Sequence, residues 1–187
     1  MTEKALTILA ISGSLRADSY NTYLLRAAQQ LAPEGIRIEV YEDLADIPPY
    51  NQDEDGEALP TTVAELRRRI TEADGLLIAT PEYNYGIPGV LKNALDWVST
   101  GKSPLAAKPV AVMGAAPTNF GSVRAQLSLR QMFLWTDSRV VVKPEVIVFH
   151  AQNRFNDQGE LVDSDTASLV QELLVSLGRV IENSQAA

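Results

Sequence analysis

The sequence predicts a doubly wound α/β fold, in which a five-stranded parallel sheet in the order 2-1-3-4-5 carries helices on both faces. First, apolar runs typical of strands alternate along the chain with stripes of helical period. Second, the first and third runs are uniformly apolar, as expected for central strands that are covered on both faces. Third, the second strand-like segment alternates apolar and charged residues, which is typical of an edge strand. Strands that alternate with helices form parallel sheets through right-handed crossovers.

Each predicted element follows from its own residue pattern. The strand-like segments are residues 6–11, 36–40, 75–79, 110–113 and 140–142. In the second of them, Ile36, Ile38 and Val40 alternate with Arg37 and Glu39. The segments with apolar residues at helical spacing are residues 24–31, 63–73, 90–98, 123–134 and 169–181. The Pro- and acid-rich residues 46–60 predict a long surface loop, and residues 156–159 predict a turn before the last helix.

Length and composition indicate one globular domain that spans residues 1–187. Hydrophobic residues make up 45% and charged residues 21%, so the chain can build a core and is not expected to be disordered. Lys and Arg total 16 against 24 Asp and Glu, which gives a formal charge of −8 and argues against a nucleic-acid partner. The chain has no cysteine, which excludes thiolate nucleophiles, disulfides and Cys-ligated metals.

The apolar run near the N-terminus, residues 5–11, is short and lacks a small-residue cleavage pattern, so it predicts a buried strand rather than a signal peptide. No apolar stretch approaches the roughly 18 residues that a membrane-spanning helix needs. We therefore expect a cytoplasmic protein without a membrane partner.

The one histidine, His150, has too few partners for a metal site or a catalytic triad. Arg67, Arg68 and Arg69 are accompanied by Glu65 and Glu72, which favours a surface helix face over a nucleic-acid patch.

Ligands of open α/β sheets bind beyond the carboxyl ends of the strands, where the strand order reverses. In the predicted order, the loops after the first, third and fourth strands meet at that point. The first of them, residues 12–22, holds four Ser and Thr hydroxyls, Asn21, Arg16 and the start of a helix. These are the groups that bind a phosphate monoester. The alternative is that Asp18 or Ser19 only caps the helix and Arg16 is solvated.

The loop after the third strand, residues 80–89, combines two tyrosines, an amide, an acid and two glycines, and Pro88 precedes a helix. A planar heteroaromatic ring needs such close backbone approach, amide donors and an aromatic surround. The helix N-terminus would stabilise negative charge on a reduced ring. The alternative is an ordinary loop on which Tyr83 and Tyr85 pack at the surface.

Two sequence blocks resemble the NAD(P)H-dependent FMN reductase family, whose members include quinone and chromate reductases with a flavodoxin-like fold. The first block is Gly13-Ser14-Leu15-Arg16, followed by Ser19 and Asn21. The second block is long and specific, and runs through residues 81–97, PEYNYGIPGVLKNALDW. Matching segments continue with Leu129-Arg130-Gln131 and Lys143-Pro144-Glu145.

The resemblance implies FMN as cofactor, NADPH or NADH as hydride donor, and a homodimer or homotetramer with each flavin near a subunit interface. The residues that it assigns to the FMN phosphate are Ser14, Arg16, Ser19, Asn21 and Thr22. The residues that it sets against the isoalloxazine are Pro81, Glu82, Tyr83, Asn84 and Tyr85, with Gly114 and Ala115 expected from the third loop. Trp97, beside the core stripe of the helix at 90–98, is expected in the core or at the interface, as is Trp135.

The third loop, residues 114–122, departs from the family pattern. Members often carry serines after this strand and a Gly-Gly pair before the helix, whereas Ala115, Ala116 and a single Gly121 stand here. Small residues still permit a ring to pack closely. Phe120 either lines the substrate side or packs against the loop.

We therefore expect an enzyme in which FMN accepts hydride and passes two electrons, by a ping-pong mechanism, to a quinone, free flavin or another small oxidant such as chromate or an azo compound. The cofactor performs the redox step, so no side chain is expected to be an essential acid or base. Glu82 and Tyr83 are expected to shape the open face of the ring. The alternatives are a flavodoxin-type electron carrier, which Arg16 counts against, and a flavin-containing redox-sensing protein.

Overall fold

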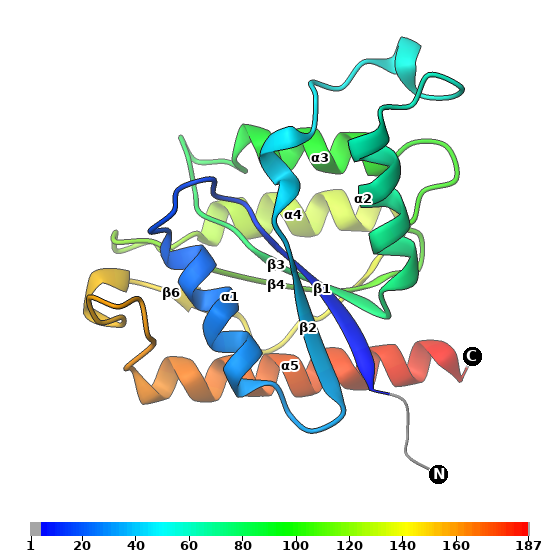
Figure 1. Cartoon of the computed structure of the whole chain (residues 1–187). Helices are drawn as coiled ribbons and strands as arrows, with labels where there is room; N and C mark the ends of the chain where they lie inside the picture. The colour runs from blue at the N-terminus through cyan, green and yellow to red at the C-terminus, as the bar shows by residue number, and fades with distance from the viewer. Residues whose placement is uncertain (1–4, 187) are drawn as a thin grey trace.

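A computed structural model describes residues 5–186 and has three layers, with helices on both faces of a parallel sheet (Figure 1). The strands are β1 (Leu6–Ser12), β2 (Ile36–Tyr41), β3 (Gly75–Ala79), β4 (Pro109–Ala115), β5 (Arg139–Val140) and β6 (Val146–Val148). The helices are α1 (Tyr20–Leu31), α2 (Thr61–Glu72), α3 (Gly89–Val98), α4 (Val123–Trp135) and α5 (Ser164–Gln185). Helices α1 and α5 cover one face, and α2, α3 and α4 cover the other.

The predicted strand order is confirmed, because the sheet runs β2-β1-β3-β4-β5 with parallel neighbours throughout. The fifth strand, predicted over 140–142, is present but ends at Val140, and a sixth strand was not predicted. Two short strands, β5 and β6, both pair with β4, through Val110 opposite Val140 and Gly114 opposite Ile147. The residues between them include Pro144, which has no N–H to donate to a ladder, so the strand is interrupted there.

The first and third strands are interior as predicted, since β1 is buried over residues 8–11 and β3 at every residue; β4 is also buried throughout. On one face, Leu24 of α1 and Leu177 of α5 pack on the sheet. On the other, Leu66 of α2, Leu95 of α3 and Leu129 of α4 do the same. Each such side chain contributes roughly 1.5–3 kcal/mol through burial. The two apolar layers hold the carboxyl ends of β1, β3 and β4 in one place.

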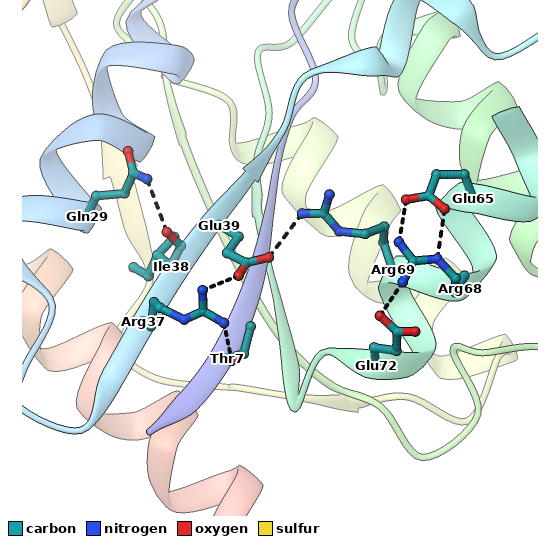
Figure 2. Close-up of polar contacts among 9 residues, drawn as sticks. All are labelled: Thr7, Gln29, Arg37, Ile38, Glu39, Glu65, Arg68, Arg69 and Glu72. Atoms are coloured by element: carbon teal, nitrogen blue, oxygen red, sulfur yellow. Dashed lines mark hydrogen bonds and ion pairs between the residues drawn. The ribbon is translucent and has the colours of Figure 1, made fainter. Parts of the chain in front are cut away.

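The edge position of β2 is also confirmed, and its solvent side is charged (Figure 2). Glu39 lies between Arg37, at 2.5 Å, and Arg69 of α2, at 3.1 Å. Arg68 bridges Glu65 and Glu72 at 2.6 and 2.5 Å. Charged side chains protect an edge strand from pairing with another chain.

Arg67 differs from its two neighbours on α2, because its guanidinium points inward. It donates to the carbonyl oxygen of Trp97 at 2.6 Å and pairs with Asp55 at 2.8 Å. The hydroxyl of Thr100, and to a smaller extent the Arg67 guanidinium, holds the pKa of Asp55 below its usual range. The surface interpretation thus holds for Arg68 and Arg69 but not for Arg67.

Helix starts lie earlier than the apolar stripes alone predicted. The side chain of Ser19 accepts a hydrogen bond from the Asn21 N–H and begins α1 at Tyr20. Asp163 accepts from the Thr166 N–H and begins α5. Both are N-caps, which fix a helix start several residues before its first core residue. Within residues 5–186, no helix combines the length and the apolar character that crossing a membrane requires.

The two tryptophans occupy opposite environments. Trp97 is fully buried, donates from Nε1 to the carbonyl oxygen of Pro48 at 2.7 Å, and meets the ring of Tyr50 edge to face. Trp135, at the end of α4, is 85% exposed. Trp97 is therefore a core residue of the single chain, whereas Trp135 is not part of the core.

Candidate cofactor site

A cavity of about 550 Å³ opens where the loops after β1, β3 and β4 converge. Its volume lies within the roughly 300–1,000 Å³ that is common for cofactor and small-molecule sites. Most of the residues expected to contact FMN line it together. These are Ser14, Arg16, Ser19, Asn21, Pro81, Glu82, Tyr83, Asn84, Tyr85 and Ala115.

Two predicted residues do not line this cavity. Thr22 lies on the other side of the first loop, where its hydroxyl is 3.1 Å from that of Ser12, and it borders a separate cavity of about 420 Å³. Gly114 lies inside β4. A Cβ atom there would be 2.0 Å from Ser122 Oγ and 2.3 Å from the Thr80 carbonyl oxygen, so Gly114 allows the strand and its neighbours to pack closely.

Some polar groups of the first loop form hydrogen bonds within the fold, and others are free to meet a ligand. Ser19 caps α1, as one of the alternatives held. The buried amide of Asn21 donates to the Ala115 carbonyl oxygen at 3.0 Å and accepts from the Ala115 N–H at 2.9 Å. Arg16 is exposed and donates to the Asp18 carbonyl oxygen at 2.8 Å. Arg16, the Ser14 hydroxyl and the positive end of α1 thus remain near the cavity as groups that can meet an anion.

The second loop turns sharply at its tip. Tyr83 and Gly86 exchange both backbone hydrogen bonds, at 3.1 and 2.9 Å. Asn84 and Tyr85 have φ values of 49° and 68°, the left-handed pair that a two-residue hairpin turn requires. Asparagine tolerates this region, whereas a bulky Tyr85 is strained there, and such strain is concentrated at functional sites. The Tyr83 hydroxyl reaches back to Ser14 Oγ at 3.5 Å, so the first two loops meet across the cavity.

An ion pair between Glu82 and Arg124 forms one wall of the cavity, and the sequence reasoning missed Arg124. The Glu82 carboxylate accepts from the Arg124 guanidinium and, at 2.9 Å, from the Arg124 backbone N–H in the first turn of α4. The guanidinium carbon lies 3.8 Å from the ring centre of Tyr85 and 4.5 Å from that of Phe120. An arginine in the first turn of a helix is unfavourable next to the positive end of the helix dipole. Its position in the sequence could therefore have indicated that a carboxylate lies nearby.

The third loop is held from behind by the segment that follows β6. Ala116 donates to the Val148 carbonyl oxygen at 3.1 Å and accepts from the Ala151 N–H at 3.1 Å. The His150 N–H donates to the Thr118 carbonyl oxygen at 3.3 Å. These backbone contacts fix Ala115 and Ala116 in the wall of the cavity.

The fold is that of the flavodoxin-like oxidoreductases, and the chain belongs to the NADPH-dependent FMN reductase family, whose sequence profile matches residues 6–153. It is 45% identical over 173 residues to the NAD(P)H-dependent FMN reductase PA1204 of Pseudomonas aeruginosa, covering 92% of this chain and 93% of that protein. It is 38% identical over 185 residues to a quinone reductase of Escherichia coli K12, covering 97% and 98%.

A solved structure agrees with this assignment. The flavoenzyme NAD(P)H:(acceptor) oxidoreductase FerB from Paracoccus denitrificans superposes with a TM-score of 0.86 at 32% identity, covering 96% of this chain and 99% of that one. The predictions of the family, of the fold, and of an NAD(P)H-dependent FMN oxidoreductase are therefore confirmed at the level of the family.

The cavity fits FMN in size and in the order of its chemical groups. Donors and the start of α1 lie at the wall made by the first loop, where a phosphate monoester would be bound. Aromatic side chains, a strained turn and the small side chains of Ala115 and Ala116 lie at the walls made by the other two loops, which suits a planar ring.

Proposed function

We propose that this protein binds one FMN in the cavity at the ends of β1, β3 and β4, oxidises NADH or NADPH, and reduces quinones or similar small oxidants. The observation that carries this proposal is the convergence of a phosphate-type loop and a ring-type loop on one cavity of about 550 Å³. The names of the relatives, FMN reductase and quinone reductase, support the same chemistry.

Arg16, Ser14 and the first turn of α1 would hold the phosphate, because a guanidinium and free N–H groups make charge-assisted bonds to its oxygens. Asn21 would act through Ala115 rather than on the phosphate, since both ends of its amide are already bonded. Pro81, Tyr83 and Ala115 would bound the ring.

FMN supplies hydride acceptance and two-electron transfer when it is bound. The chain's own part is to bind the ring, orient it and leave one side accessible. Tyr85 and Phe120 are 72% and 55% exposed, so the rim of the cavity is open to solvent. If one side of the bound ring is accessible, the nucleotide and the acceptor must occupy the same space one after the other. Because the two substrates then cannot bind at once, a ping-pong order is expected.

We also propose that the protein is at least a homodimer and that α4, rather than α3, supplies the contact. Trp97 of α3 is buried within the chain and has no surface to offer. Along α4, Leu127, Leu134 and Trp135 are 53%, 81% and 85% exposed. Apolar side chains that gather on one helix surface mark an interaction site.

The proposal is tested by titrating FMN into the apoprotein and then following NAD(P)H oxidation with a quinone. We expect stoichiometric FMN binding and sustained quinone reduction with at least one nucleotide. Tight FMN binding with electron exchange only to a partner protein would favour the carrier alternative. Failure to bind FMN would contradict the proposal.

A further inference from the structure

The Glu82–Arg124 pair is nearly closed to solvent on the carboxylate side. The Glu82 side chain is 9% exposed and the Arg124 side chain 27%. Both Glu82 oxygens are used, one by the Arg124 guanidinium and the other by the Arg124 backbone N–H at 2.9 Å. The rings of Tyr85 and Phe120, at 3.8 and 4.5 Å from the guanidinium carbon, hold the arginine in position at the cavity rim.

This pair decides the charge that a bound molecule meets at that wall. Among residues 5–186, the charged side chains that line the cavity are Arg16, Glu82 and Arg124. Arg16 belongs to the phosphate wall. The charge of Glu82 cancels that of the Arg124 guanidinium, and its second oxygen accepts from the first turn of α4, so the side chains of the wall beside Tyr85 and Phe120 carry no net formal charge.

We propose that Glu82 determines acceptor specificity: by neutralising Arg124, it makes the cavity select uncharged planar acceptors over anionic ones. This inference rests on the proposed function and narrows its acceptor class. Without the carboxylate, Arg124 and the start of α4 would form an anion-binding wall. Glu82 is thus a specificity residue that acts through Arg124.

The experiment compares FMN-loaded wild type with Glu82→Gln, using 1,4-naphthoquinone and its 2-sulfonate as acceptors. Glutamine keeps the size and an oxygen that can accept from the Arg124 N–H groups, while it removes the charge. The measured quantity is the ratio of kcat/KM for the sulfonate to kcat/KM for the uncharged quinone. We expect this ratio to rise about tenfold, the effect of one unit charge several ångströms away in a partly wetted site, and to rise less at high salt.

Arg124→Gln tests the same claim from the other side, because it leaves the carboxylate uncompensated. Its ratio should fall below the wild-type value, and the double variant Glu82→Gln/Arg124→Gln should return close to it. Glu145→Gln is the matched control, since Glu145 forms an exposed ion pair with Lys143 at 3.0 Å and does not line the cavity. Its ratio should equal that of wild type.

A binding measurement separates this inference from the enzyme proposal. Naphthalene-2-sulfonate, titrated against the flavin absorbance of each loaded variant, should bind about tenfold tighter to Glu82→Gln than to wild type. That comparison remains decisive even if no variant oxidises NAD(P)H, which would contradict the proposed function alone. Unchanged ratios and unchanged sulfonate affinity in Glu82→Gln and Arg124→Gln would overturn the specificity role and leave the pair with a structural one.

Discussion

The side-chain amide of Asn21 makes both possible backbone hydrogen bonds to Ala115, donating at 3.0 Å and accepting at 2.9 Å. Asn21 lies in the first turn of α1, and Ala115 is the last residue of β4, 94 positions later in the chain. Asn21 is 2% exposed. One buried side chain therefore joins the loop that would bind phosphate to the loop that would support the ring.

We predict that Asn21→Ala destabilises the apoprotein by roughly 1–3 kcal/mol, because the buried N–H and carbonyl of Ala115 lose their partners. FMN affinity should fall with it, since the two loops would no longer be held together. Urea unfolding of the apoprotein gives the stability change. Gln30→Ala, on the exposed side of the same helix, is the control and should be neutral. A wild-type unfolding midpoint for Asn21→Ala would refute the linking role.

Arg16→Ala should weaken FMN binding roughly ten- to hundredfold without unfolding the chain, because one charge-assisted bond to phosphate is lost. The Arg16 side chain is exposed and donates a hydrogen bond to the Asp18 carbonyl oxygen, so its removal leaves no buried gap. Fluorescence titration of FMN measures the affinity. Arg26→Ala, an exposed arginine of α1 outside the cavity, should bind FMN normally. Equal affinity for both variants would remove Arg16 from the phosphate site.

The raised pKa of Tyr41 leads us to predict that the free energy of unfolding falls at alkaline pH. Burial, with smaller contributions from nearby carboxylates, raises the pKa of Tyr41 from 10.0 to about 12. Because the folded pKa is the higher one, this contribution to stability is complete below pH 10 and is lost as the pH rises from about 10 to 12. Unfolding free energy should fall by roughly 1–3 kcal/mol over that window. In Tyr41→Phe this part of the decline should be missing, and an identical pH profile in the variant would contradict the assignment.

Replacing the exposed apolar residues of α4 should shift the assembly toward monomers. Light scattering of the wild type at micromolar concentration should report at least twice the chain mass of 20.4 kDa. Leu134→Glu/Trp135→Glu places charge in the proposed contact and should give the monomer mass. Val175→Glu, on the half-exposed side of α5, serves as the control and should keep the wild-type mass. A monomeric wild type would rule the assembly out.

The sequence predicted the sheet well because its central strands carry a signal that few other structures produce. Runs such as Leu76, Leu77 and Ile78 are apolar at every position, and only a strand covered on both faces needs that. The fifth strand was harder, since Val140–Val142 and Val146–Val148 are two equivalent apolar triplets and the pattern alone does not say that β4 pairs with both.

The lining residues of the cavity were predicted correctly where they belong to a contiguous sequence motif. They were missed or misplaced where only the direction of a side chain in the folded chain determines whether it reaches the cavity. Thr22 lies one residue after Asn21, and the 100° turn between neighbours on a helix carries its side chain to the other side of the loop. Arg124 is 42 residues from Glu82, so only the folded chain brings the two together. Trp135 was expected in the core or at a subunit interface, and its exposure at the end of α4 excludes the core of the single chain.

The most direct test of the central claim, that nucleotide and acceptor use one FMN cavity in turn, is an initial-rate study in which NAD(P)H and a quinone are varied together. The account predicts parallel reciprocal plots, and it predicts that NAD(P)H alone bleaches the bound FMN in the absence of air. Intersecting plots would show both substrates bound at once and contradict the shared cavity. If neither NADH nor NADPH bleached the bound FMN, the proposal that the protein is an NAD(P)H-dependent enzyme would be contradicted.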